Sequence, residues 1–325
     1  MTAYILRRVL YAIPILIGVN LITFLLFFVV NSPDDMARMH LGQKRVTTEA
    51  IEGWKAEHGY DRPLVYNPAA PGLASLTDTI FFQKSVKLFA FQFGSSDDGR
   101  DIGYDISQRM WPSLAIAVPV LILGLAFNIS YALFIVFFRA TYIDIGSVVL
   151  LVGMLSVSSL FYIIGGQFVL SKVFHLVPIS GYDQGLDAWK FLILPVIVGV
   201  VGGIGSGTRW YRTLFLEEIA KDYVRTARAK GLGERFVLFR HVLRNALIPI
   251  LTGVVVVLPL LFMGSLITES FFGIPGLGSY TIDAISNQDF AIVRSMVFLG
   301  AVLYILGLIL TDISYTLVDP RVRLQ

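Results

Sequence analysis

The chain has 325 residues, of which 55% are hydrophobic and 15% are charged, and its mean hydropathy is +0.72. Soluble domains are usually about 45–50% apolar and about 25% charged, so this composition excludes an ordinary water-soluble protein and indicates a bilayer as solvent. The chain contains no cysteine, which excludes disulfides, thiol nucleophiles and thiolate metal sites. The net charge of +3 is small, so the position of the charges is more informative than their sum.

Six segments are apolar and long enough to cross a membrane, which takes roughly 20 residues per helix. They are residues 9–30, 111–137, 146–170, 191–207, 246–268 and 295–317. Arg7 and Arg8 precede the first segment, as in a signal peptide, but the segment is too long and Asn31-Ser32-Pro33 is a poor cleavage site. We therefore predict an all-α polytopic membrane protein with six transmembrane helices, the first being an uncleaved anchor.

Lysine and arginine in short loops predict the orientation of the helices. Basic residues gather before the first segment and after the second, fourth and sixth: Arg7, Arg8, Arg139, Arg209, Arg212, Lys221, Arg321 and Arg323. These loop ends all fall on one side, so that side is predicted to be the cytoplasm and both termini are predicted to be cytoplasmic. The predicted organisation is an anchor and first helix at 1–30, a long periplasmic loop or cap at 31–110, and a five-helix core at 111–325 with a cytoplasmic loop at 209–244.

The basic cytoplasmic loop has a helical pattern of its own. Residues 217–230 are good helix formers, Gly231 and Gly233 interrupt them, and residues 234–243 resume a helical pattern that leads into the fifth segment. Pro249 lies inside the start of that segment, where it could kink the helix. Such a segment could transmit movement from the cytoplasm to the fifth helix. A positive anchor among anionic headgroups would explain the charge alone, but not the paired glycines.

The loop also carries a family signature. YVRTARAKGL at 223–232, followed by RHVLRNALIP at 240–249, resembles the cytoplasmic signature loop of ABC importer permeases, specifically the B-type subunit of dipeptide and oligopeptide permeases. Similar motifs run along the chain: AYILRRVL at 3–10, HGYDRPLVY at 58–66, FQFGSS at 91–96, ISQRMWPSLAIA at 106–117, LVPISGY at 176–182, ESFFGIPGLG at 269–278 and DISYTLVDPRVR at 312–323. Residues 66–91 depart from the family pattern, because the loop is longer there and contains FFQKSVKLFAF.

The resemblance implies that the loop docks into a groove on a cytoplasmic ATPase and transmits its movement. The implied coupling residues are Tyr223, Thr226, Ala227, Lys230, Gly231 and Leu232. Thr226 and Ala227 would face the ATPase, and the last three would lie near the tip. The implied partners are a homologous second permease in a heterodimer, two ATPase subunits that carry ATP and Mg, a periplasmic substrate-binding protein and membrane lipid, with no nucleic acid. No cofactor or metal is expected on this chain itself.

Three acidic residues and one turn are candidates for the transport pathway. Glu269 and Asp283 flank the turn at 272–278, in which the glycines, Gly276 among them, permit sharp backbone conformations and Pro275 stiffens the entry. The resemblance suggests an outer gate, where the two carboxylates could meet a peptide amino group; a re-entry loop before an interfacial helix at 279–286 is the plainer explanation. Asp312 near the end of the sixth segment is a further candidate, or else a structural partner of Arg209 or Arg139.

The sequence contains no recognisable catalytic motif. A phosphate-binding G-x-x-x-x-G-K-[ST] run and an H-E-x-x-H run are both absent, so ATP must be hydrolysed by another chain. The glycine-rich run at 199–207 lies in an apolar segment and is explained by close helix packing. We therefore expect a non-enzymatic, inner-membrane permease subunit of an ATP-driven, binding-protein-dependent peptide importer. Open alternatives are the same machinery importing nickel or an oligosaccharide, a lone ion-coupled transporter, and a membrane scaffold.

Overall fold

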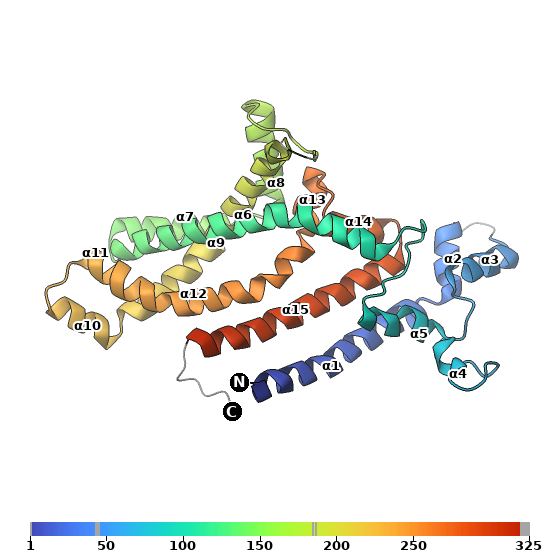
Figure 1. Ribbon diagram of the computed structural model, residues 1–325. Helices are drawn as coiled ribbons and strands as arrows, with labels where there is room; N and C mark the ends of the chain where they lie inside the picture. Colours follow the sequence, from blue (N-terminus) through green and yellow to red (C-terminus); the bar gives the residue numbers. More distant parts are fainter. Residues whose placement is uncertain (1, 43–45, 184, 186, 319–325) are drawn as a thin grey trace. The chain divides into compact units, whose positions relative to one another are not determined.

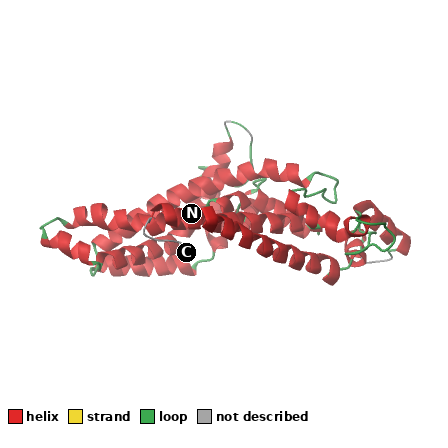
Figure 2. Cartoon of the chain, turned by 60° about the horizontal axis from the view of Figure 1, so that its bottom comes forward, coloured by secondary structure: helices red, strands yellow, loops and turns green. Residues whose placement is uncertain are grey.

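The computed structural model describes residues 2–42, 46–183, 185 and 187–318. Within these residues the regular elements are helices, apart from an isolated bridge between Ser95 and Asp101, and Figure 2 draws no strand in them. Contacts divide the chain into two compact units. Unit 1 contains the chain up to Arg109 together with Tyr280–Ile309, and unit 2 contains Met110–Ser279 together with the described residues from Leu310 onward. The all-helical prediction is confirmed for the described residues.

Five helical stretches in the described chain are long and apolar enough to cross a membrane. They are Leu6–Val30, Ile102–Phe137, Ala188–Ile219, Glu234–Met263 and Phe290–Ser314. A sixth crossing is possible only if Tyr142–Ser156 and Ser159–Val173, which meet at an angle of 90°, form one broken span. The prediction of a continuous third span is therefore wrong. Val157 and Ser158 have extended backbones at the break, and just before it the Ser156 hydroxyl donates to the Val152 carbonyl at 3.0 Å.

Unit 1 joins the first helix to the segment 31–110, which we call the cap segment (Figure 1). Along the chain, unit 1 contains α1 (Thr2–Phe24), the π-helix η1 (Leu25–Val30), α2 (Pro33–Leu41), α3 (Thr48–His58), α4 (Ala74–Thr77), α5 (Ile80–Lys84), the 3-10 helix η2 (Val86–Ala90), the start of α6 (Ile102–Phe137), most of α14 (Leu277–Ser286) and much of α15 (Phe290–Val318). Ser32 and Asp35 form a reciprocal capping box at the start of α2. The core of the cap segment contains Trp54 and Tyr60, packed on Phe28 from η1.

Unit 2 holds the remaining helices. They are the rest of α6, α7 (Tyr142–Ser156), α8 (Ser159–Gly166), the π-helix η3 (Gln167–Val173), α9 (Ala188–Ile219), α10 (Asp222–Ala229), α11 (Glu234–Phe236), the π-helix η4 (Val237–Val242), α12 (Leu243–Val257), the 3-10 helix η5 (Pro259–Met263) and α13 (Leu266–Phe272). Helix α9 is anchored on α6 where the Thr208 hydroxyl donates to the Asn128 side chain at 2.9 Å. This buried bond is the helix-to-helix contact expected of polar residues inside apolar spans.

Two predicted span boundaries in unit 2 are corrected. The fourth span was predicted to end at residue 207, but α9 continues to Ile219 because Tyr211, Phe215 and Ile219 pack into the core of the unit. The fifth was predicted at 246–268, but the continuous stretch runs over Glu234–Met263. It ends at Gly264, whose φ of 68° is a left-handed value that favours glycine, and α13 begins as a separate helix after Ser265.

Candidate functional site

The predicted coupling segment, residues 223–232, is docked firmly onto its own unit. Val224 in α10 is 0% exposed and Ala227 is 5% exposed. They belong to a hydrophobic core that also contains Leu133 of α6, Phe215 of α9 and Val237 of η4. Two apolar residues three positions apart lie on one face of a helix, so α10 turns this face inward and is packed against the helices on either side of it.

Burial of Ala227 corrects one prediction. Ala227 was expected to face an ATPase, but its side chain is enclosed by the core of unit 2. Thr226, the neighbouring residue, is exposed and donates its hydroxyl to the Asp222 carbonyl at 3.0 Å. The surface that α10 offers to a partner is therefore its opposite face, with Arg225 and Thr226, and not the face of Ala227.

Lys230, Gly231 and Leu232 are exposed at the end of α10. Gly231 has φ 76°, a backbone conformation that residues with side chains rarely adopt, and its N–H donates to the Arg228 carbonyl at 2.9 Å. The helix break predicted at Gly231 is therefore confirmed. Figure 1 shows α10 and α11 next to each other on the two sides of this break.

A carboxylate that the sequence analysis did not single out, that of Glu234, binds two arginines beside this break, and we call these three residues the clamp. Glu234 accepts hydrogen bonds from Arg139 Nη1 at 2.7 Å and from Arg228 Nε and Nη2 at 3.1 and 2.9 Å. The clamp ties together the end of α6, the end of α10 and the start of α11. Arg139 had been considered as a partner of Asp312; its guanidinium binds Glu234 instead. Asp312 itself is half-buried in α15.

Tyr223, the first predicted coupling residue, is held from the side of α9. Its phenol donates to a Glu218 carboxylate oxygen at 2.6 Å, and Lys221 pairs with the same carboxylate. Burial, followed by the hydrogen bond to Glu218, raises the pKa of Tyr223 to about 12. The phenol therefore stays protonated at physiological pH and remains a donor that fixes the start of α10.

Replacing Glu234 with glutamine is expected to lower the free energy of unfolding by about 1–2 kcal/mol. Hydrogen bonds to charged groups contribute about 1.5–3 kcal/mol each, but the three side chains are partly exposed, so solvent screening reduces the loss. A double-mutant cycle that combines Glu234→Gln with Arg228→Gln, read by thermal unfolding in detergent, measures the coupling. Strict additivity of the two changes would contradict the clamp.

The second candidate region surrounds Glu269, which is 1% exposed. Its Oε1 accepts the Ser265 N–H and its Oε2 accepts the Ser279 N–H, each at 3.1 Å. The Ser113 hydroxyl also donates to this carboxylate. Burial raises the pKa of Glu269, while these hydrogen bonds oppose the rise. A side chain at Gly276 would overlap the carboxylate, which explains the glycine there.

These contacts give Glu269 a structural role. It was considered as a contact for a peptide amino group, and in the structure its Oε1 and Oε2 accept the N–H groups of Ser265 and Ser279. Asp283 is exposed in α14 and belongs to unit 1, whereas Glu269 belongs to unit 2. Pro275 is exposed and Gly276 is buried. The predicted helix at 279–286 is confirmed as part of α14.

Next to Glu269 lies a cavity of about 370 Å³ in unit 2. Its walls are mostly apolar and come from α6, α9, α12, η5 and α13, and Ser113, Thr268 and Glu269 supply polar groups. The cavity has the size and the apolar lining with few polar groups that are typical of small-molecule sites. The sequence analysis did not find it, because Ser113 and Glu269 are far apart in the chain.

A comparison with protein families identifies the family to which the chain belongs. The family described as "Binding-protein-dependent transport system inner membrane component" matches residues 135–324, more than half of the chain. The chain belongs to this family. A model for the N-terminal part of the same membrane components matches residues 1–71. The family resemblance stated from the motifs is confirmed, and this inner-membrane component has several apolar helices that suit a multi-pass protein.

Three relatives of this inner-membrane component cover nearly its whole length. It is 33% identical to a putative peptide transport system permease protein of Brucella abortus, over 99% of both chains. It is 30% identical to the di/tripeptide transport system permease protein DppB of Pseudomonas aeruginosa, over 100% of both chains. It is 27% identical to the glutathione transport system permease protein GsiC of Escherichia coli, over 99% of both chains.

Proposed function

We propose that the chain is a permease subunit of an ATP-driven, binding-protein-dependent importer of small peptides. The observation that carries this proposal is its 33% identity, over 99% of both chains, to a protein named as a peptide transport permease. Relatives named for di/tripeptide and for glutathione transport extend the support, since glutathione is itself a small peptide. The chain supplies part of the membrane pathway and carries no catalytic residue of its own.

The other subunits of the proposed importer are partner chains. A homologous second permease forms a heterodimer with this one, two ATPase subunits bind ATP and Mg on the cytoplasmic side, and a periplasmic binding protein delivers the peptide. Both termini of this chain are cytoplasmic, and the cap segment is periplasmic. In this arrangement the exposed end of α10, with Thr226, Lys230, Gly231 and Leu232, contacts an ATPase.

The docking of α10 supports a direct mechanical link. Its inward face is packed against α6, α9 and η4, and η4 continues into α12. Movement imposed on the exposed end of α10 is then transmitted to α9 and α12, because packed interiors transmit strain. ATP binding favours one arrangement of the two permeases and hydrolysis releases it, which gives alternating access by differential binding to two states.

Co-purification and uptake test the proposal together. The tagged chain is extracted gently from its native membrane, co-purifying proteins are identified by mass spectrometry, and uptake of labelled di- and tripeptides is compared in cells with and without the chain. We expect a second permease, an ATPase with a phosphate-binding loop, and peptide uptake that depends on the chain. If the ATPase is recovered but peptide uptake does not depend on the chain, the substrate is not a small peptide. If the chain is recovered alone after crosslinking, the proposed assembly with partner chains is wrong.

A further inference from the structure

Unit 1 contains a basic cavity that the proposed transport function does not use. Its volume is about 480 Å³. Arg62, Lys84, Lys87 and Arg294 line it, and Glu57 is the acidic residue among its lining residues. Lys84 and Lys87 lie between residues 71 and 135, a stretch that neither family match covers. A ligand for this cavity would therefore have to complement several positive charges.

Arg294 is the deepest of these cations and is 2% exposed. Its guanidinium carbon lies 5.3 Å from the centre of the Phe28 ring. Nε and Nη1 are nevertheless buried without a hydrogen-bond partner. Buried charged donors are normally paired, and a guanidinium matches the geometry of an oxyanion. Arg294 is among the residues that line the cavity, so its guanidinium favours an oxyanion as the ligand.

The nearest carboxylates bind elsewhere. Asp289 accepts the Ile292 N–H at 3.1 Å through Oδ1 and the Asp97 N–H at 2.9 Å through Oδ2. The Asp97 carboxylate lies 3.7 Å from His58 Nε2 and 3.9 Å from His40 Nδ1. Both acids contribute negative potential near Arg294, but their oxygens face other donors.

Lys84 adds a second, partly buried cation. Its Nζ lies 5.0 Å from the centre of the Tyr60 ring. Burial, and after it the charge of Arg294, lowers the pKa of Lys84 to about 8. Arg62 and Lys87 lower this pKa further, while Asp97 raises it. Positive charge is thus crowded around the cavity, and a bound anion would relieve the crowding.

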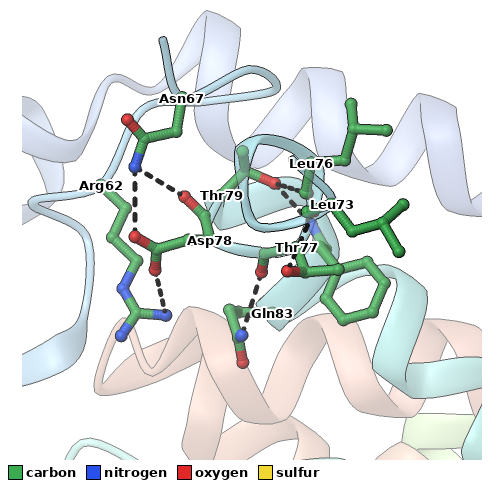
Figure 3. Close-up of polar contacts among 9 residues, drawn as sticks. Arg62, Asn67, Leu73, Leu76, Thr77, Asp78, Thr79 and Gln83 are labelled. Atoms are coloured by element: carbon green, nitrogen blue, oxygen red, sulfur yellow. Dashed lines mark hydrogen bonds and ion pairs between the residues drawn. The ribbon is translucent and has the colours of Figure 1, made fainter. Parts of the chain in front are cut away.

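Figure 3 shows that the wall at Arg62 is fixed by its own hydrogen bonds. Arg62 Nη1 lies 3.3 Å from Asp78 Oδ1, and the Asn67 amide donates to Asp78 Oδ2 at 3.1 Å. Gln83, another lining residue, donates to the Thr77 carbonyl at 3.1 Å. The wall is therefore ordered without a ligand.

The cavity lies where membrane spans end. Phe28 is near the end of the span Leu6–Val30, and Arg294 is near the start of the span Phe290–Ser314. Exposed apolar side chains, including Val30 and Phe91, lie in the same unit. The ends of membrane spans lie at the level of the lipid headgroups, so a basic pocket there can meet a headgroup phosphate. We propose that this cavity binds a phosphate group, presented by the headgroup of an anionic phospholipid.

Titration of the delipidated transporter in detergent tests the site. The probes are short-chain phosphatidylglycerol, short-chain phosphatidylcholine and inorganic phosphate, and the thermal midpoint reports binding. We expect phosphatidylglycerol to bind at least about tenfold more tightly than phosphatidylcholine, and Lys84→Gln to weaken it about tenfold, as loss of a charge-assisted hydrogen bond does. Lys55→Gln is the matched control, because Lys55 pairs with Asp34 and does not line the cavity.

The contrary outcomes are distinct. Equal binding of the two lipids together with no response to phosphate would overturn the site, as would an equal loss of affinity in Lys55→Gln. Phosphate binding that depends on Lys84, without any lipid preference, would overturn the lipid as source and assign the site to a soluble anion. Arg294→Gln is a second variant, and if it fails to fold, Lys84→Gln still decides the result.

The pH dependence gives an independent readout with sulfate, whose charge is constant in this range. Lys84 is charged below its pKa of about 8 and neutral above it. Sulfate affinity should therefore fall between about pH 7 and about pH 9 in the native chain. In Lys84→Gln the affinity for sulfate should be lower and should not change with pH in this range. The same fall in both proteins would assign the titration to another group and contradict the role of Lys84.

Discussion

Replacing Glu269 with alanine is expected to destabilise unit 2. The change removes a fully buried acceptor that serves the N–H groups of Ser265 and Ser279 and the hydroxyl of Ser113. Each buried donor left without a partner costs about 1–3 kcal/mol, so the three donors together are expected to cost about 3–9 kcal/mol. Proteins are stable by only about 5–15 kcal/mol, so a loss of this size removes a large part of the stability and lowers the folded fraction on heating.

The measurement is the fraction of chain that remains monodisperse in size-exclusion chromatography after heating in detergent. Glu269→Gln keeps one acceptor oxygen but turns an amide toward backbone donors, so an intermediate loss is expected. Asp283→Ala removes an exposed carboxylate from α14 and should leave the heating curve unchanged. If Glu269→Ala were as stable as the native chain and only transport were lost, the carboxylate would have a role in the pathway and not in the turn.

The sequence predicts the helices of this protein well because a span requires a long apolar run, which is visible locally. The ends of the spans are less predictable. Helix α9 continues through Arg209 and Arg212 to Ile219, and this extension depends on contacts of Tyr211 and Phe215 with other helices. Arg212 is accommodated because it donates to Asp144 of α7 at 2.7 Å. Such partners are distant in sequence and cannot be read from composition.

The candidate functional regions likewise contain features that the sequence could predict and features that it could not. Gly231 could be identified as a break from its position after a run of helix formers, since the signal is local. The inward face of α10 was not predicted: Ala227 was expected to face the ATPase, although its spacing of three residues from Val224 places both on one face of a short helix. The Glu269 turn could not be predicted, because it depends on Ser113, which is brought to it from α6 by the fold.

Replacing Leu232 with aspartate is expected to reduce peptide uptake at least about tenfold while the chain folds normally. Leu232 is 36% exposed at the end of α10, outside the core that holds Val224 and Ala227. If the exposed end of α10 docks on an ATPase, a new carboxylate there would be desolvated without a partner, and such a charge at the centre of an interface costs several kcal/mol, about 2–5. A loss of about 1.4 kcal/mol already corresponds to a factor of ten.

The readouts are uptake of a labelled dipeptide, recovery of the ATPase with the tagged chain, and the thermal midpoint of the chain. Leu73→Asp is the matched control, because it makes the same substitution at a leucine that is 82% exposed in the cap segment. We expect Leu232→Asp to lose uptake and ATPase together with an unchanged midpoint, and Leu73→Asp to keep all three. Full uptake and full ATPase recovery in Leu232→Asp would show that the exposed end of α10 is not the coupling surface. The basic segment would then serve only to fix the orientation of the chain in the membrane, because its charge alone suffices for that role.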